Sequence, residues 1–155
     1  MRYSIGIGER VISESIDDVL VTHALASCVA VTIYCKIRNK AGMIHIALPS
    51  KSKHSMIETP WHFADVGLPL FIEEMLTVSH CCKSDFDVCV YGGAESKLSS
   101  DIFQIGLKNL QQVEKTLKSY TLNYKFIATG GHLSRTIELS VRTGNIEVFE
   151  LPLLI

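Results

Sequence analysis

The feature that most constrains the fold is a run at residues 29–37 (VAVTIYCKI), in which β-branched side chains predominate. Such side chains fit the pleated surface of a strand, and the lack of a regular polar alternation predicts a strand buried on both faces. Residues 38–40 (RNK) predict a turn, and residues 42–48 predict a second strand that stops at Pro49. The two runs therefore predict a β-hairpin.

The rest of the chain mixes strand-like and helix-like patterns. Thr59 and Pro60 have the residue types of a helix N-cap and a first helical position, but Gly67 and Pro69 are expected to interrupt the helix that would start there. Strands outnumber helices without regular strand–helix alternation, so we expect one α/β domain of the α+β type spanning residues 1–155. The expected strands are 3–7, 11–12, 19–21, 86–91, 124–129, 136–141 and 146–151, and the expected helices are 69–78 and 105–120.

Composition and charge exclude several classes of partner. Apolar residues make up 47% of the 155-residue chain, charged residues make up 20%, and the net charge is −1. This balance favours an ordinary globular domain and argues against binding to nucleic acid or to an anionic membrane. We find no signal peptide, no run approaching the ~20 apolar residues of a membrane span, and no CxxC pair among the five cysteines. We therefore expect a cytoplasmic protein with free thiols and no membrane insertion.

A thiol and an imidazole belong to the predicted hairpin region. Cys28 follows Ala26 and Ser27 in a turn of small residues, where backbone N–H groups could approach a substrate oxygen and form an oxyanion site. His45 lies in the second strand, where apolar neighbours would keep the imidazole neutral and able to accept a proton. The alternatives are an inert core thiol and a structural histidine, since cysteine is among the most buried residue types. Together the two side chains are the minimum for nucleophilic acyl transfer.

Sequence spacing does not by itself bring these two side chains together. A hairpin with a two-residue turn at 39–40 would pair His45 with Tyr34. Cys28 would then lie about 20 Å further along the strand. An acyl-transfer site would therefore need Cys28 at a bend and His45 on a strand other than its hairpin partner. A thiol activated as a nucleophile would also be expected to titrate below the roughly 8.5 of a free cysteine.

The remaining candidate residues carry weaker signals. Thr22 is either an ordinary strand residue or the group that orients the imidazole by accepting its second ring N–H. Residues 80–82 (HCC) are of types that bind metal ions, but adjacent cysteines chelate poorly and no second pair stands at zinc spacing. Residues 6–8 (GIG) lack the third glycine of a dinucleotide-binding loop. We therefore expect neither a metal nor a cofactor.

Several motifs recur in the order typical of one family. They are VLVTHALASCVAV at 19–31, GMIHIALP at 42–49, IEEML at 72–76, YGGA at 91–94, Ile105-Gly106 with Asn109, and Gly130-Gly131 with Arg135. In this order they resemble the CheD family of chemoreceptor glutamine deamidases. The resemblance implies a cysteine-hydrolase fold of mixed β-sheets with flanking helices, shared with the cytotoxic necrotizing factor toxins. It also implies a catalytic triad formed by Cys28, His45 and Thr22.

The same resemblance implies an activity and partners. Glutamines on the cytoplasmic helices of methyl-accepting chemotaxis receptors would be converted to glutamate through a cysteine thioester, with glutamyl methylesterase activity as a side reaction. A second hypothesis is a docking module that binds chemoreceptors and a CheC-type phosphatase, with Phe103 as either a contact residue or a core aromatic. Two positions depart from the family pattern. Ala26 replaces a glycine, at a cost of about 1 kcal/mol if its φ is positive, and residues 132–134 (HLS) replace a polar loop at the substrate rim.

Overall fold

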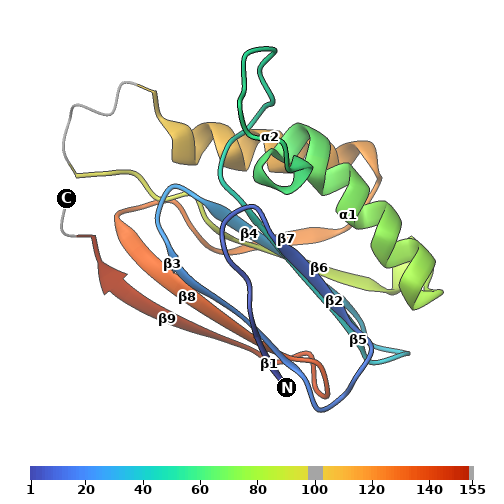
Figure 1. Cartoon of the computed structure of the whole chain (residues 1–155). Coiled ribbons are helices and arrows are strands. Elements are labelled where there is room, and N and C mark those ends of the chain that lie inside the picture. Colours follow the sequence, from blue (N-terminus) through green and yellow to red (C-terminus); the bar gives the residue numbers. More distant parts are fainter. Residues whose placement is uncertain (98–102, 154–155) are drawn as a thin grey trace.

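Three layers make up the molecule in a computed structural model that describes residues 1–97 and 103–153. Two helices form the first layer, a five-stranded sheet the second and a four-stranded sheet the third (Figure 1). Each sheet contains one parallel pair of strands and is otherwise antiparallel. The expected mixed-sheet α+β architecture is confirmed, and the helices α1 and α2 are too short or too polar to cross a membrane.

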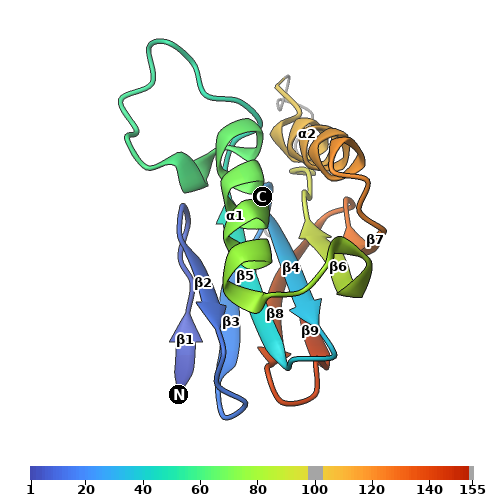
Figure 2. The ribbon, with the colours of Figure 1, turned by 90° about the vertical axis from the view of Figure 1, so that its right-hand side faces the viewer.

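The five-stranded sheet is the central layer. Its strands follow the order β2 (Arg10–Ser13), β5 (Lys40–Ile46), β4 (Val29–Cys35), β6 (Phe86–Gly92) and β7 (Tyr124–Thr129). The predicted hairpin therefore lies in the middle, and every residue of β4 is buried as expected for a strand covered on both faces. Both helices cover the same face of this sheet (Figure 2).

The helices and the second sheet enclose two separate apolar cores. The helices α1 (Ala64–Ser79) and α2 (Ile105–Ser119) bury one face of β4 and β5. The opposite face packs on the four-stranded sheet, whose order is β1 (Arg2–Ser4), β3 (Val19–Leu25), β8 (Leu133–Ser140) and β9 (Ile146–Pro152). Alternate residues of β4 therefore enter different cores, which explains why its sequence lacks polar alternation.

The hairpin register differs from the one expected. Strand β4 ends at Cys35, and residues 36–39 form the turn, so Ile37 is 67% exposed instead of continuing the strand. Asn39 adopts a left-handed φ of 50°, and its Nδ2 donates to the backbone oxygen of Arg142 at 2.7 Å. Cys35 therefore pairs with Lys40, and His45 pairs with Ala30. The expected strand, which was based on β-branched residues, ended at Ile37, two residues too late. The tertiary contact at Asn39 fixes the turn instead.

Helix α1 begins five residues earlier than expected. It runs through both Gly67 and Pro69, the two residues expected to interrupt it. A Cβ on Gly67 would lie 2.5 Å from the carbonyl oxygen of Pro60, so the glycine permits close packing of the short 3₁₀ helix at 60–62. Pro69 lies near the helix N-terminus, where its missing N–H removes only one bond in the second turn. Burial of Ala64 and Leu68 outweighs this loss.

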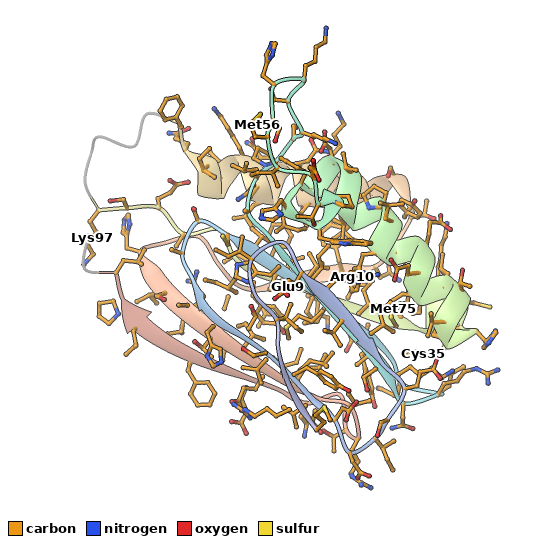
Figure 3. All side chains as sticks on the ribbon, viewed as in Figure 1. Glu9, Arg10, Cys35, Met56, Met75 and Lys97 are labelled. Carbon is orange, nitrogen blue, oxygen red and sulfur yellow. A yellow bond between two sulfur atoms is a disulfide. The ribbon has the colours of Figure 1, made fainter. Side chains whose placement is uncertain are left out.

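Short 3₁₀ helices precede α1 and β6. The first, η1 (Pro60–His62), begins as predicted, with Thr59 Oγ1 accepting from the Trp61 N–H at 3.3 Å and Pro60 in the first turn. The second, η2 (Lys83–Asp85), connects α1 to β6. Figure 3 shows Met56 on the loop before η1, at the end of the molecule opposite Cys35, and Met56 is 93% exposed.

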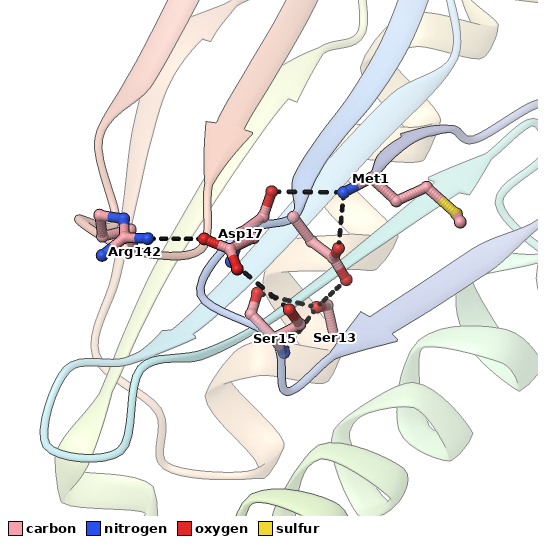
Figure 4. A network of polar contacts seen from close by, with 6 residues as sticks. Met1, Ser13, Ser15, Asp17 and Arg142 are labelled. Atoms are coloured by element: carbon pink, nitrogen blue, oxygen red, sulfur yellow. Dashed lines mark hydrogen bonds and ion pairs between the residues drawn. The ribbon is translucent and has the colours of Figure 1, made fainter.

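A polar network closes the end of the molecule where the chain starts (Figure 4). The Asp18 carboxylate accepts from Ser13 Oγ at 2.6 Å and pairs with the Met1 ammonium at 3.0 Å. These partners, with Ser13 the stronger influence, hold the pKa of Asp18 below its ordinary value. Arg142 pairs with Asp17 at 2.6 Å, which joins the β8–β9 turn to the same network. The network fixes the start of β3, the strand that leads to Cys28.

A disulfide corrects the expectation that all thiols are free. Cys35, at the end of β4, is bonded to Cys81 just after α1, with Cα atoms 6.7 Å apart. Cys28, Cys82 and Cys89 carry free thiols. Sequence spacing gave no signal for this pair, since the two cysteines are 46 residues apart and meet only because α1 packs across the sheet.

Counting thiols tests this pairing. Alkylation of the unfolded protein without reductant should label the three free cysteines, and reduction should raise the number to five. Cys81→Ser should lower the free energy of unfolding in urea by roughly 2–4 kcal/mol, because the bond closes a long loop. Cys82→Ser is the matched control and should leave stability unchanged. Labelling of all five cysteines without reductant would contradict the pairing.

Candidate functional site

The turn that carries Cys28 connects the two sheets. Strand β3 ends at Leu25, the chain bends at 26–27, and Cys28 immediately precedes β4. The segment after β6 holds this turn from behind: the Ala94 N–H donates to the Ala26 oxygen at 2.7 Å, and the Gly93 N–H donates to the Cys28 oxygen at 2.9 Å. Cys28 therefore lies at a bend, as expected, and its thiol is partly exposed.

Glycines at 92 and 93 make this close approach feasible. A Cβ on Gly92 would lie 2.3 Å from the Cys28 carbonyl oxygen, and Gly92 and Gly93 have φ values of 96° and 69°. The expected strand 86–91 stops just before this pair, one residue short of the end of β6 at Gly92, but the sequence alone did not indicate that the pair supports the cysteine turn. Two consecutive glycines near the end of a buried strand were the available signal.

Alanine at position 26 carries no backbone strain. Ala24 has a positive φ of 53°, whereas Ala26 does not have a positive φ. Ala24 lies where the pairing of β3 with β8 shifts between Thr22 and Leu25. The expected cost of replacing glycine at Ala26 therefore does not apply.

Thr22 fixes the orientation and tautomer of His45. The Thr22 hydroxyl donates to the Ile5 carbonyl oxygen at 2.7 Å, and its Oγ1 lies 2.8 Å from His45 Nδ1. A hydroxyl has a single proton, and the carbonyl can only accept it, so His45 Nδ1 must carry a proton and donate it to Oγ1. The other ring nitrogen, Nε2, is then an unprotonated acceptor, and it is buried without a hydrogen-bond partner among the described residues.

The hairpin register itself brings Cys28 and His45 to the same face. His45 pairs with Ala30, and Cys28 precedes Ala30 by two residues, so the three side chains point to the same side of the sheet. Cys28 is thus diagonal to His45, a position with a Cβ separation of roughly 7–8 Å or less. The expectation that His45 must come from a different strand is wrong, because the turn lies at 36–39.

Burial keeps both groups neutral. Desolvation lowers the pKa of His45, and nearby His62 lowers it further, while the Ile5 carbonyl and Glu9 act in the opposite direction. Desolvation also raises the pKa of the Cys28 thiol. The expectation of a thiol pKa below the ordinary value is therefore wrong for the resting site. At neutral pH the site holds a thiol and a neutral imidazole, not an ion pair.

The remaining candidates from the sequence are Ser27, Phe103 and the segment 132–134. Ser27 forms part of the bend, and Phe103 is 63% exposed, which rules out a core aromatic. His132 Nδ1 lies 2.8 Å from the Glu95 carbonyl oxygen, so the 132–134 segment packs against the chain that follows β6. The described residues contain no cluster of three or more histidine, cysteine or acidic side chains arranged to hold a metal ion.

Fold and site define an α+β protein that places a partly exposed thiol and a buried, proton-accepting imidazole at the end of a central hairpin. Residues 47–150, more than half of the chain, match the model of the family described as CheD chemotactic sensory transduction. The chain belongs to the CheD family.

Relatives of similar length support this assignment. A protein of Syntrophotalea carbinolica is 36% identical over 93% of this chain and 91% of its own, and one of Caldanaerobacter subterraneus is 34% identical over 93% and 90%. A protein of Pyrococcus abyssi is 30% identical over 94% and 85%. Each of the three relatives is named "Probable chemoreceptor glutamine deamidase CheD".

Nitrogen NMR of the histidine rings tests the tautomer and the pKa. Neutral His45 should show the Nδ1–H form, because its Nδ1 donates to Thr22, and it should protonate below the ordinary value of 6.5, because burial disfavours the cation. The unfolded chain then binds the proton more readily, so stability should fall as pH drops from 6.5 through the lowered pKa. An Nε2–H tautomer, or protonation at or above 6.5, would refute this assignment.

Proposed function

We propose that this protein is a glutamine deamidase that acts on chemoreceptors, with Cys28 as nucleophile and His45 as general base. The observation that carries the proposal is the geometry of the buried His45, which lies diagonal to Cys28. Its Nδ1 is bound to Thr22, and its Nε2 has no hydrogen-bond partner among the described residues. Membership in the CheD family and the names of the relatives support the substrate class.

The first half of the reaction forms a thioester. His45 Nε2 takes the Cys28 proton as Sγ attacks the side-chain carboxamide carbon of a glutamine. The amide oxygen becomes an oxyanion, and the N–H groups of Ser27 and Cys28 are suited to bind it. The protonated imidazole then donates its Nε2 proton to the leaving nitrogen, the C–N bond breaks, and ammonia departs.

The second half hydrolyses the thioester. His45 Nε2 takes a proton from water, and the resulting hydroxide attacks the thioester carbon. The C–S bond then breaks, glutamate is released, and Cys28 recovers a proton. A glutamyl methyl ester presents the same carbon, with methanol as the leaving group, so methylesterase activity is the expected side reaction.

Neutral resting groups make His45 a true general base. Burial raises the pKa of Cys28 and lowers that of His45, so proton transfer accompanies the attack on the substrate. Thr22 holds the Nδ1–H and thereby keeps Nε2 available to accept the proton. A neutral threonine stabilises the imidazolium less than a carboxylate would, which fits a base that returns its proton within the same half of the reaction.

A docking role can coexist with catalysis. Phe103 is exposed on the chain leading to α2, and Leu107, at the start of that helix, is 44% exposed. Exposed aromatic side chains are enriched at protein–protein interfaces. We propose chemoreceptor helices as the substrate and a CheC-type phosphatase as a second partner of this surface.

Deamidation of receptor cytoplasmic fragments tests the proposal directly. Wild-type protein should convert specific glutamines to glutamate, as followed by mass spectrometry. Cys28→Ala should abolish the conversion, because it removes the attacking sulfur atom. Cys82→Ser removes another free thiol, one that is exposed, and should retain activity. If wild type binds the fragments without deamidating them, the enzymatic proposal fails and the docking role remains.

Two substitutions at Thr22 test the orienting hydroxyl. Thr22→Val keeps the shape but leaves His45 Nδ1 and the Ile5 carbonyl without their partner. We expect kcat to fall by about 10²–10⁴-fold, which is the range that general acid–base catalysis contributes, with little change in KM. Thr22→Ser keeps the hydroxyl and should retain most activity. Equal kcat values for the valine variant and wild type would exclude an orienting role.

A further inference from the structure

Asn109 is a buried polar residue with no role in the mechanism described so far. It lies on α2 and is fully buried. Its Nδ2 donates two hydrogen bonds, one to the carbonyl oxygen of Ser27 at 2.9 Å and one to that of Ala47 at 3.0 Å. Ser27 directly precedes Cys28, and Ala47 lies two residues after His45. One side chain therefore joins the two backbone segments that carry the thiol and the imidazole.

The bond to Ser27 sets the direction of the Cys28 N–H. The Ser27–Cys28 peptide is planar and trans, so its C=O and N–H groups point in opposite directions. Because Asn109 holds the Ser27 oxygen toward α2, the Cys28 N–H must point away from the helix. The bond from the Ala94 N–H to the Ala26 oxygen fixes the Ser27 N–H in the same manner. In the described part of the chain, neither N–H has a hydrogen-bond partner.

Gly106 explains how α2 comes close enough for this contact. A Cβ at this position would lie 2.4 Å from the Ala94 oxygen and 2.5 Å from the Gly93 oxygen. The first turn of α2 therefore rests on the same backbone that holds the cysteine turn. Asn109 follows Gly106 by three residues and lies on the same side of the helix.

The two contacts at position 109 require a side chain that donates hydrogen bonds. Both partners are carbonyl oxygens, which only accept, so the nitrogen must face them and Oδ1 must point elsewhere. That oxygen is buried without a partner among the described residues. A leucine or an aspartate carboxylate could fill the space but could not donate to either carbonyl.

We propose that Asn109 is a positioning residue that orients the Cys28 N–H as an oxyanion donor. This inference rests on acyl transfer at Cys28, the proposed function. Asn109 touches neither the substrate nor the reacting atoms, and it acts through the Ser27–Cys28 peptide.

Two reactions of Cys28 separate this role from a merely structural one. Acetylation by p-nitrophenyl acetate forms the Sγ–C bond of a thioester, expels p-nitrophenolate and passes through an oxyanion. Alkylation by iodoacetamide substitutes iodide at a saturated carbon and forms no oxyanion. Both adducts are assigned to Cys28 by peptide mass in the full-length wild type and in the variants Asn109→Asp and Asn109→Ala. Thr116→Ala, at another buried polar position of α2, is the control for damage to the helix.

Acetylation should fall about 10²–10³-fold in both Asn109 variants, the loss typical of a missing oxyanion donor, while alkylation keeps its wild-type rate. Thr116→Ala should retain both rates. The inference is overturned if both reactions slow together, if acetylation is unchanged, if Thr116→Ala loses as much acetylation, or if wild type is not acetylated at all. Deamidation of receptor fragments is measured in parallel. A wild type that is acetylated at Cys28 but deamidates nothing refutes the glutamine substrate and leaves the role of Asn109 intact.

Discussion

The register of the β4–β5 hairpin is the constraint on which the rest of the site depends. It pairs His45 with Ala30 and thereby places the imidazole diagonal to Cys28. Side chains alternate between faces, so a slip of one residue would turn His45 toward the helices and away from Thr22. The register is fixed at the far end of the hairpin, where the left-handed Asn39 binds Arg142. The geometry of the site therefore depends on a turn at the opposite end of the strand pair.

Burial between two sheets gives the site its chemical character. Thr22 comes from β3 in one sheet and His45 from β5 in the other, and their hydrogen bond crosses the core between them. The same burial raises the pKa of the Cys28 thiol and lowers that of His45. Neutral groups resist adventitious oxidation and alkylation better than a preformed thiolate would. The packing of the two sheets thus keeps the proposed nucleophile and the proposed base in their neutral forms.

Much of the fold could be read from the chain. The expected range 124–129 matches β7, and helix 105–120 differs from α2 by one residue. Predictions from residue composition were wrong where long-range contacts determine the local structure. Gly67 and Pro69 looked like helix breakers, yet α1 includes both: η1 packs against the glycine, and the proline lies near the helix N-terminus. The Cys35–Cys81 bond had no local signal, since it joins residues that only the packing of α1 brings together.

By itself the sequence determined the candidate side chains: a cysteine in a turn of small residues, a histidine in an apolar strand and a threonine ahead of them. It determined these because the residue type sets the chemical reactivity of a side chain, and the local pattern of residues favours strand formation. Only the tertiary structure decided that Thr22 binds His45, that the hairpin register places His45 diagonal to Cys28, and that Asn109 binds the cysteine turn. Those features depend on hydrogen bonds between segments far apart in the chain, so they cannot be predicted from local sequence spacing.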